Sequence, residues 1–278
     1  MVLRGDSRRR RRNAGPPWGL LLVLAALALG AYVLIQTRLG NALSLIPVVA
    51  TPAPTPTATR SVESFAREAD DIRDTGNYRK ALPIYEQALR RKPNDIPLQF
   101  QIVRLLVFSG QASKAESRAL RMVQLAPRDA LARIGLCLVQ DWLGKVSEAL
   151  ASCREAVALD PANSTAQAYL AEALADNANY TEAVKTARTA VELDPQNVDA
   201  YRNLGYAYEM ATNYSQAVVY YERALQINPN LPHVLLALGR VYAALGVGTK
   251  AIFYFDQAIS VDPLYAEAWE RKGATHAV

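Results

Sequence analysis

Six prolines recur at a constant interval along the chain, and this spacing constrains the fold more than any other feature. Successive members of the set lie 34 residues apart: Pro93, Pro127, Pro161, Pro195, Pro229 and Pro263. A period held through six occurrences without insertion or deletion indicates six copies of one structural unit. The copies are expected at residues 62–95, 96–129, 130–163, 164–197, 198–231 and 232–265, followed by a shorter seventh copy at 266–278.

Each copy contains two stretches with the apolar periodicity of an amphipathic helix. In the fifth copy, Leu204 and Tyr208 belong to one apolar face, and Ala217 and Tyr221 belong to another. Spacings of three and four residues indicate helices rather than strands. A short break separates the two stretches, as at Gly76-Asn77-Tyr78, and the closing proline cannot continue the second helix. The unit is therefore predicted to be a helix hairpin.

The residues at fixed places of the unit give this pattern a family resemblance. In the last two complete copies they are Tyr201, Leu204, Gly205, Tyr208, Ala217, Tyr221, Ala224 and Pro229, then Leu235, Leu238, Gly239, Tyr242, Ala251, Phe255, Ala258 and Pro263. The pattern resembles the tetratricopeptide repeat and extends over residues 62–278. The resemblance implies an all-α fold: a right-handed superhelical solenoid of about six helix hairpins, with a C-terminal capping helix at 266–278.

Small residues at two places of the unit predict close packing of the helices. Glycine occupies the first place at Gly205, Gly239 and Gly273. Alanine occupies the second place in all six copies: Ala81, Ala115, Ala149, Ala183, Ala217 and Ala251. Small residues in a constant register set a short distance and a constant angle between helices. A constant offset between units then gives a curved solenoid with a concave inner face.

The chain before the repeats differs from them in composition. We divide it into a basic tail at residues 1–17, an apolar stretch at 18–38 and a Pro/Thr-rich linker at 39–61. The uncharged run from Trp18 to Ile35 is near the minimum length for one transmembrane helix. Because arginines precede it, we expect a single-pass anchor in the cytoplasmic membrane, with a cytoplasmic N-terminus and extracytoplasmic repeats. The alternative is a cleaved signal peptide, with Ala28-Leu29-Gly30 as its cleavage region.

The formal net charge of +5 arises from the segment before the repeats. Residues 62–278 contain 23 of the 31 basic residues and 25 of the 26 acidic ones, so the repeats themselves are slightly acidic. No basic surface for nucleic acid is expected on them.

Cys137 and Cys153 both lie in the third copy, at places expected to be level with each other on the inward faces of the two helices. An extracytoplasmic location would permit a disulfide between them. The alternative is two small buried thiols.

The sequence favours binding over catalysis. It contains only two histidines, His233 and His276, and it has no nucleophile-elbow or phosphate-loop motif. No metal site, cofactor or catalytic residue is therefore predicted, and we expect a protein that is not an enzyme.

The resemblance also implies a binding surface. In this family the concave face is lined by the first helix of each unit, and it binds protein or peptide ligands. The corresponding residues here are Phe100, Arg104, Phe108, Ile134, Leu138, Trp142, Tyr169, Glu172, Arg202 and Tyr206. Their apolar members would anchor an extended peptide or a helix, and their charged members would set its register. The alternative is that several of them pack against the next helix.

These features predict a membrane-anchored scaffold that binds a partner protein during the assembly of cell-envelope proteins. One alternative is a structural subunit that associates with itself as a homo-oligomer. Another is an accessory module of a separate secretion or glycan-processing enzyme.

Overall fold

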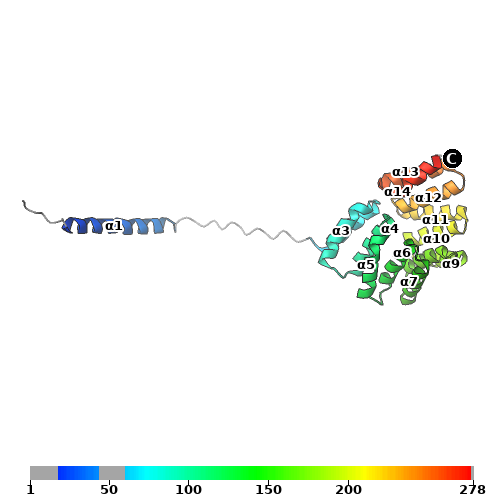
Figure 1. Ribbon diagram of the computed structural model, residues 1–278, viewed down its shortest axis with the longest axis horizontal. Helices are drawn as coiled ribbons and strands as arrows, with labels where there is room; N and C mark the ends of the chain where they lie inside the picture. The colour runs from blue at the N-terminus through cyan, green and yellow to red at the C-terminus, as the bar shows by residue number, and fades with distance from the viewer. Residues whose placement is uncertain (1–17, 44–59, 277–278) are drawn as a thin grey trace, which may run out of the picture. The chain divides into compact units, whose positions relative to one another are not determined.

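The computed structural model describes residues 18–43 and 60–276 of the chain. The basic tail at 1–17 and most of the linker at 39–61 lie outside these ranges. The described residues belong to two units, which we treat separately because their relative placement is not determined. One is helix α1, and the other, which we call the repeat body, begins at Arg60 (Figure 1).

Helix α1 (Trp18–Leu43) carries the apolar stretch of the N-terminal region. Its segment Trp18–Leu39 has 22 residues, and a helix needs about 20 apolar residues to cross the hydrocarbon core of a bilayer. The segment is therefore long and apolar enough to span a membrane. A signal sequence near the N-terminus would have the same properties.

The repeat body consists of six helix hairpins and one further helix. The hairpins are α2 (Val62–Asp74) with α3 (Tyr78–Arg91), α4 (Ile96–Phe108) with α5 (Ala112–Leu125), α6 (Ala130–Trp142) with α7 (Val146–Leu159), α8 (Ser164–Asp176) with α9 (Tyr180–Leu193), α10 (Val198–Met210) with α11 (Tyr214–Ile227), and α12 (Pro232–Ala244) with α13 (Gly248–Val261). The final helix is α14 (Ala266–His276). All regular secondary structure in residues 18–43 and 60–276 is helical, so the all-α prediction is confirmed.

A recurring cap explains why the first helices start in register. After the proline that ends a hairpin, an Asp or Asn side chain accepts a hydrogen bond from the backbone N–H three residues later. Asp95 accepts from Leu98 at 3.0 Å, and Asp129 accepts from Ala132 at 3.0 Å. Asn163 and Asn197 cap the next two first helices in the same way. Such caps stabilise a helix start by about 1 kcal/mol each.

Small residues pack against large ones where the two helices of a hairpin meet. A Cβ atom on Gly205 would lie 2.8 Å from the ring of Tyr221, and one on Gly239 would clash with the ring of Phe255. Gly273 in α14 has open space around it, because no second helix follows α14 in the described chain. The second small place is fully buried in every hairpin, at Ala81, Ala115, Ala149, Ala183, Ala217 and Ala251.

The repeat body closes on itself (Figure 1). Its first hairpin contacts the two short segments that follow the fifth and the sixth hairpins. The Asn230 side chain donates a hydrogen bond to the Asp74 carbonyl at 3.2 Å. Arg79 donates to the Leu264 carbonyl at 3.3 Å and lies 3.7 Å from the Asp262 carboxylate. The inner face is therefore enclosed rather than open along one side. We call the enclosed space the lumen.

Candidate functional site

An aromatic cluster fills the middle of the lumen. The ring of Phe108, on α4, stacks on the imidazole of His233, on α12, with centroids 4.3 Å apart and planes 7° from parallel. Nδ1 of His233 lies 3.3 Å from the Tyr78 hydroxyl, on α3. The three rings thus join the first, second and sixth hairpins at one point.

Two ion pairs surround this cluster. Nη2 of Arg104 donates to both carboxylate oxygens of Asp199, at 2.7 and 2.9 Å. Arg202 binds both oxygens of the Glu172 carboxylate, one of them at 2.9 Å. The guanidinium carbons of both arginines lie over the Phe108 ring, at 5.7 and 5.4 Å from its centroid. Such cation–π contacts strengthen when water is excluded, and together with the Arg104–Asp199 pair the contact of Arg202 with Phe108 links α10 to α4.

The lumen contains two pockets. One, of about 370 Å³, is lined by Tyr78, Arg104 and Asp199 among others. The second has about 210 Å³, and we call it the Trp142 pocket; its lining residues include Asp141, Trp142, Glu172, Asp176, Arg202, Tyr206, His233, Arg240 and Glu267. His233 borders both pockets, so the Phe108–His233 stack forms a wall between them.

Most of the apolar residues predicted to line a binding groove are buried. They are Phe100, Phe108, Ile134, Leu138 and Tyr169, and Ile134 and Leu138 have no exposed surface. The prediction of an exposed apolar lining is therefore wrong for these five. These five side chains are buried for two reasons. Helices α4, α6 and α8 pack side by side and cover part of the surface of these residues, and the first hairpin closes the inner face on which they lie.

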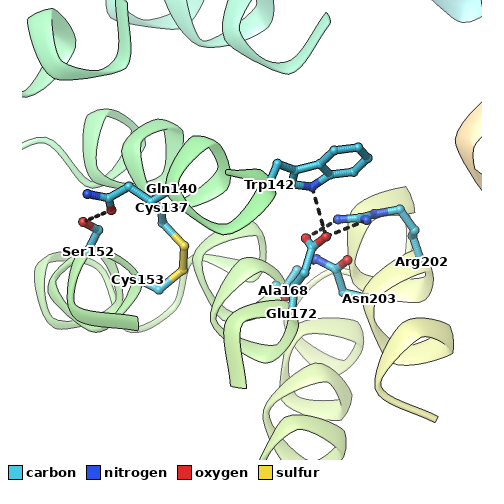
Figure 2. The surroundings of a disulfide bond; sticks show 9 residues. All are labelled: Cys137, Gln140, Trp142, Ser152, Cys153, Ala168, Glu172, Arg202 and Asn203. Carbon is cyan, nitrogen blue, oxygen red and sulfur yellow. Dashed lines mark hydrogen bonds and ion pairs between the residues drawn. A yellow bond between two sulfur atoms is a disulfide. The ribbon is translucent and has the colours of Figure 1, made fainter. Parts of the chain in front are cut away.

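Trp142 is the apolar member of the predicted set that keeps substantial exposure. Its side chain is 37% exposed at the end of α6. Figure 2 shows the indole beside the Glu172–Arg202 pair, with its Nε1 atom donating to Glu172 at 3.3 Å. Among the polar members, Arg104, Glu172 and Arg202 are engaged in ion pairs, and Tyr206 donates to Asp176. Trp142 is thus the accessible aromatic group of the site.

Glu172 belongs to the set predicted from the sequence, whereas three other acidic residues of the lumen do not. Asp141 and Asp176 lie in the last turns of α6 and α8, and Asp199 lies in the first turn of α10. Carboxylates on regular helices are usually solvated, so their presence in the sequence gives no reason to expect a site. The signal that could have found them is their position on the same inward helix faces as Trp142 and Arg202.

Burial shifts the pKa of two groups at this site. Burial, followed by the neighbouring carboxylates of Glu172 and Asp176, raises the pKa of Asp141 to about 9. Burial and the positive charges of Arg202 and Arg104 hold the pKa of His233 well below its ordinary value. At neutral pH the site therefore contains a protonated carboxyl group and a neutral imidazole.

A disulfide joins Cys137 in α6 to Cys153 in α7, with Cα atoms 5.3 Å apart (Figure 2). This separation lies within the normal range for disulfides. The bond ties α6, which carries Trp142 at its end, to its partner helix. Close by, the Ser152 hydroxyl donates to Gln140 at 2.7 Å across the same pair of helices.

The described residues do not form a metal centre. Within residues 18–43 and 60–276, no group of three or more His, Cys, Asp and Glu side chains is arranged to hold a metal ion.

Comparisons with known proteins agree with the repeat architecture. Tetratricopeptide repeat profiles match residues 73–137, 169–232 and 208–272. Among solved structures, a chain of the APC/C hetero-tetramer Cut9–Hcn1 aligns with a TM-score of 0.55 at 16% identity, covering 78% of this chain and 43% of that one. A thermophilic TPR protein of Thermus thermophilus aligns with a TM-score of 0.51 at 18% identity, covering 78% of this chain and 100% of that one.

These likenesses show the fold alone, and this chain spans less than half the length of the Cut9–Hcn1 chain. A search of curated protein sequences finds no match.

Proposed function

Because the chain belongs to the tetratricopeptide repeat family, we propose that it is a membrane-tethered scaffold that binds a segment of a partner protein at the Trp142 pocket. Tetratricopeptide repeats are in general non-catalytic scaffolds for protein–protein interaction. A solenoid of this kind acts through the surface that its stacked units present.

The observation that carries this proposal is the exposure of Trp142 at the edge of a polar pocket. Partly exposed tryptophans that border a pocket are typical of binding hot spots, because they bury a large apolar area on contact. The buried neighbours Ile134 and Leu138 support its helix from behind. In place of a long apolar groove, we propose that the partner inserts one or a few side chains into the pocket and lies across its rim.

We further propose that α1 anchors the repeat body on the extracytoplasmic side of a membrane. The arginines before the apolar segment support this orientation by the positive-inside rule. The disulfide between Cys137 and Cys153 is in keeping with an oxidising compartment. A scaffold in that position would serve the assembly of envelope proteins. Recovery of the full chain from the membrane pellet after an alkaline wash is expected, and its complete release would contradict the anchor.

Site-specific photo-crosslinking in intact cells tests the binding site. A photo-reactive residue in place of Trp142 is expected to form a discrete adduct with a partner protein. The matched control carries the same residue in place of Leu193, which is 41% exposed at the end of α9. Identical adducts from both positions, or none from position 142, would contradict the proposed site.

A second candidate function is self-association. Three large apolar side chains are exposed at the C-terminal end of the repeat body: Phe253, Leu264 and Trp269. Exposed apolar groups at the end of a solenoid can pack against a second copy. Sedimentation of the full chain in detergent distinguishes the two functions, since a monomer at all concentrations excludes this one.

A further inference from the structure

The Trp142 pocket is small and collects charge from five helices. Its volume of about 210 Å³ is below the roughly 300–1,000 Å³ that is usual for drug-sized ligands. A pocket of this size suits one side chain of a partner. Its charged lining comes from the ends of α6 and α8, from α10 and α12, and from the start of α14.

The acidic residues that line this pocket outnumber its arginines. Glu172 is paired with Arg202, and Arg240 lies 3.1 Å from Glu209. Asp176 accepts a hydrogen bond from Tyr206. Each of the two arginines is therefore matched by a carboxylate of its own, while Asp141 has no ion-pair partner among the described residues.

Two polar groups that line the pocket have unused hydrogen-bonding capacity. Asp141 is 7% exposed; a hydrogen bond with the Asp176 carboxyl group contributes to its raised pKa, whereas its Oδ1 atom has no hydrogen-bond partner in the described protein. His233 is 8% exposed, and its Nε2 atom likewise has none. Buried polar atoms are nearly always paired in folded proteins. Two such atoms beside one pocket leave hydrogen-bonding capacity that a ligand or an ordered water molecule can complete.

The missing group should be a cation. Burial and the charges of Glu172 and Asp176 disfavour the carboxylate form of Asp141, and a positive charge in the pocket would reverse that effect. A cation would also find the exposed indole of Trp142 beside it, which attracts positive charge through its π face. Because the described residues offer no arrangement of three ligands for a metal ion, an organic cation fits better than a metal.

We infer that the Trp142 pocket binds a cationic side chain, a lysine or an arginine, of the partner protein. The inference rests on the proposed function, and it adds the chemistry of the partner. Asp141 supplies the charge, Trp142 supplies the apolar and cation–π surface, and the paired Glu172 and Arg202 form the fixed floor.

The test uses the purified full chain in detergent micelles and two probes with the same four-carbon side chain, one of which ends in an ammonium group. These are N-acetyl-lysine-N-methylamide and its uncharged counterpart N-acetyl-norleucine-N-methylamide. The indole N–H resonance of Trp142, assigned by its loss in Trp142→Phe, reports on binding. A saturable shift with the lysine probe and none with the norleucine probe is expected. Equal responses to both probes would overturn the inference.

Asp141→Asn keeps the shape of the side chain and removes its charge. It is expected to weaken lysine binding at least tenfold, whereas Glu270→Gln should leave it unchanged, because Glu270 is exposed on α14 outside the pocket. Binding should also release protons at pH 7, measured by calorimetry in buffers of different ionisation enthalpy, and the release should vanish in Asp141→Asn. Unchanged affinity in Asp141→Asn would overturn the inference.

The same experiments distinguish a failure of this inference from a failure of the proposed function. If the crosslink from position 142 forms equally well in Asp141→Asn, the binding site stands and the cationic ligand is wrong. If the lysine probe binds but no crosslink forms, the pocket chemistry stands and the proposed function is wrong.

Discussion

The Tyr78 hydroxyl and Nδ1 of His233 lie 3.3 Å apart, although the two residues are separated by 155 positions in the sequence. In an open solenoid each unit contacts only its neighbours, and stability is approximately a sum over adjacent pairs. The contact between the first and sixth hairpins adds a stabilising interaction between two units that are not adjacent in the solenoid. The repeat body should therefore unfold more cooperatively than an open array of the same length.

Removal of this link should loosen the first hairpin. Tyr78→Phe loses one buried hydrogen bond, which is worth about 1 kcal/mol. His233→Ala also loses the stack on Phe108, and we expect a larger loss of about 2 kcal/mol. Hydrogen exchange should accelerate in α2 and α3 before it does in α8 and α9. Uniform acceleration along the repeat body would contradict the closing role of this contact, and Tyr180→Phe, at the first position of α9, serves as the control.

The histidine should also make stability depend on pH. The pKa of His233 is held low by burial and by Arg202 and Arg104, so the unfolded chain binds this proton more readily than the folded protein. The contribution of neutral His233 to the stability of the folded protein is therefore complete above a pH of about 6.5. It is lost as the pH falls below that value, by up to about 1.4 kcal/mol per pH unit. His233→Phe keeps an aromatic ring in the stack and cannot titrate. Urea unfolding of the two proteins from pH 7 to pH 5 should show a smaller loss in the variant; parallel curves would contradict this origin.

Asp141 should make stability depend on pH in the opposite direction to His233. Burial and the carboxylates of Glu172 and Asp176 raise its pKa to about 9, so the folded protein binds this proton more tightly than the unfolded chain. Stability is therefore lost as the pH rises from about 4 towards 9. Asp141→Asn should be more stable than the parent protein at pH 8, by several kcal/mol, with the difference shrinking by about 1.4 kcal/mol per pH unit and vanishing near pH 4. A difference that does not vary with pH would show that the variant acts through packing instead.

The periodicity of the sequence predicts most of the fold, but it does not predict the environment of particular residues in the lumen. The 34-residue spacing predicts every hairpin, because prolines, caps and small residues all act locally, within one unit or between neighbours. The closure of the repeat body depends on a small angle between units, summed over six of them. No single residue encodes that sum, so the burial of Phe108 and Leu138 could not be read from the pattern. The environment of Asp141 likewise depends on the closure, since the pocket beside it is lined by charged residues of five helices.

Reduction of the disulfide should lower stability without abolishing the fold. The bond between Cys137 and Cys153 closes a segment with a sequence separation of 16, for which the loop-entropy estimate is about 3 kcal/mol. Both positions are fully enclosed by α6 and α7, so Cys137→Ala with Cys153→Ala should lose a comparable amount. Thiol titration of the unfolded, unreduced protein checks the bond directly. Two reactive thiols per chain would contradict it.

Two hairpin turns contain residues in the backbone conformation that favours glycine. Gly76, Gly110, Gly144 and Gly246 occupy the turns of the other four hairpins with φ between 73° and 79°. Ala178 and Thr212 take the corresponding place in the fourth and fifth hairpins with φ of 58°. This conformation costs a residue with a Cβ atom roughly 1–2 kcal/mol. A change to glycine removes that cost, but part of the gain in stability is lost because glycine makes the unfolded chain more flexible.

Thr212→Gly should therefore stabilise the repeat body by a net ~0.5–1 kcal/mol. Thr212 is exposed, so the change should leave its neighbours in place. Gly144→Ala, at the equivalent place of the third hairpin, should destabilise by a similar amount because it introduces the strain that Thr212→Gly removes. Thr189→Gly, in the interior of α9, is a second control and should lose roughly 0.3–0.5 kcal/mol, the difference between the helix propensities of threonine and glycine. The midpoint of urea unfolding checks all three, and a loss of stability in Thr212→Gly would contradict backbone strain at this turn.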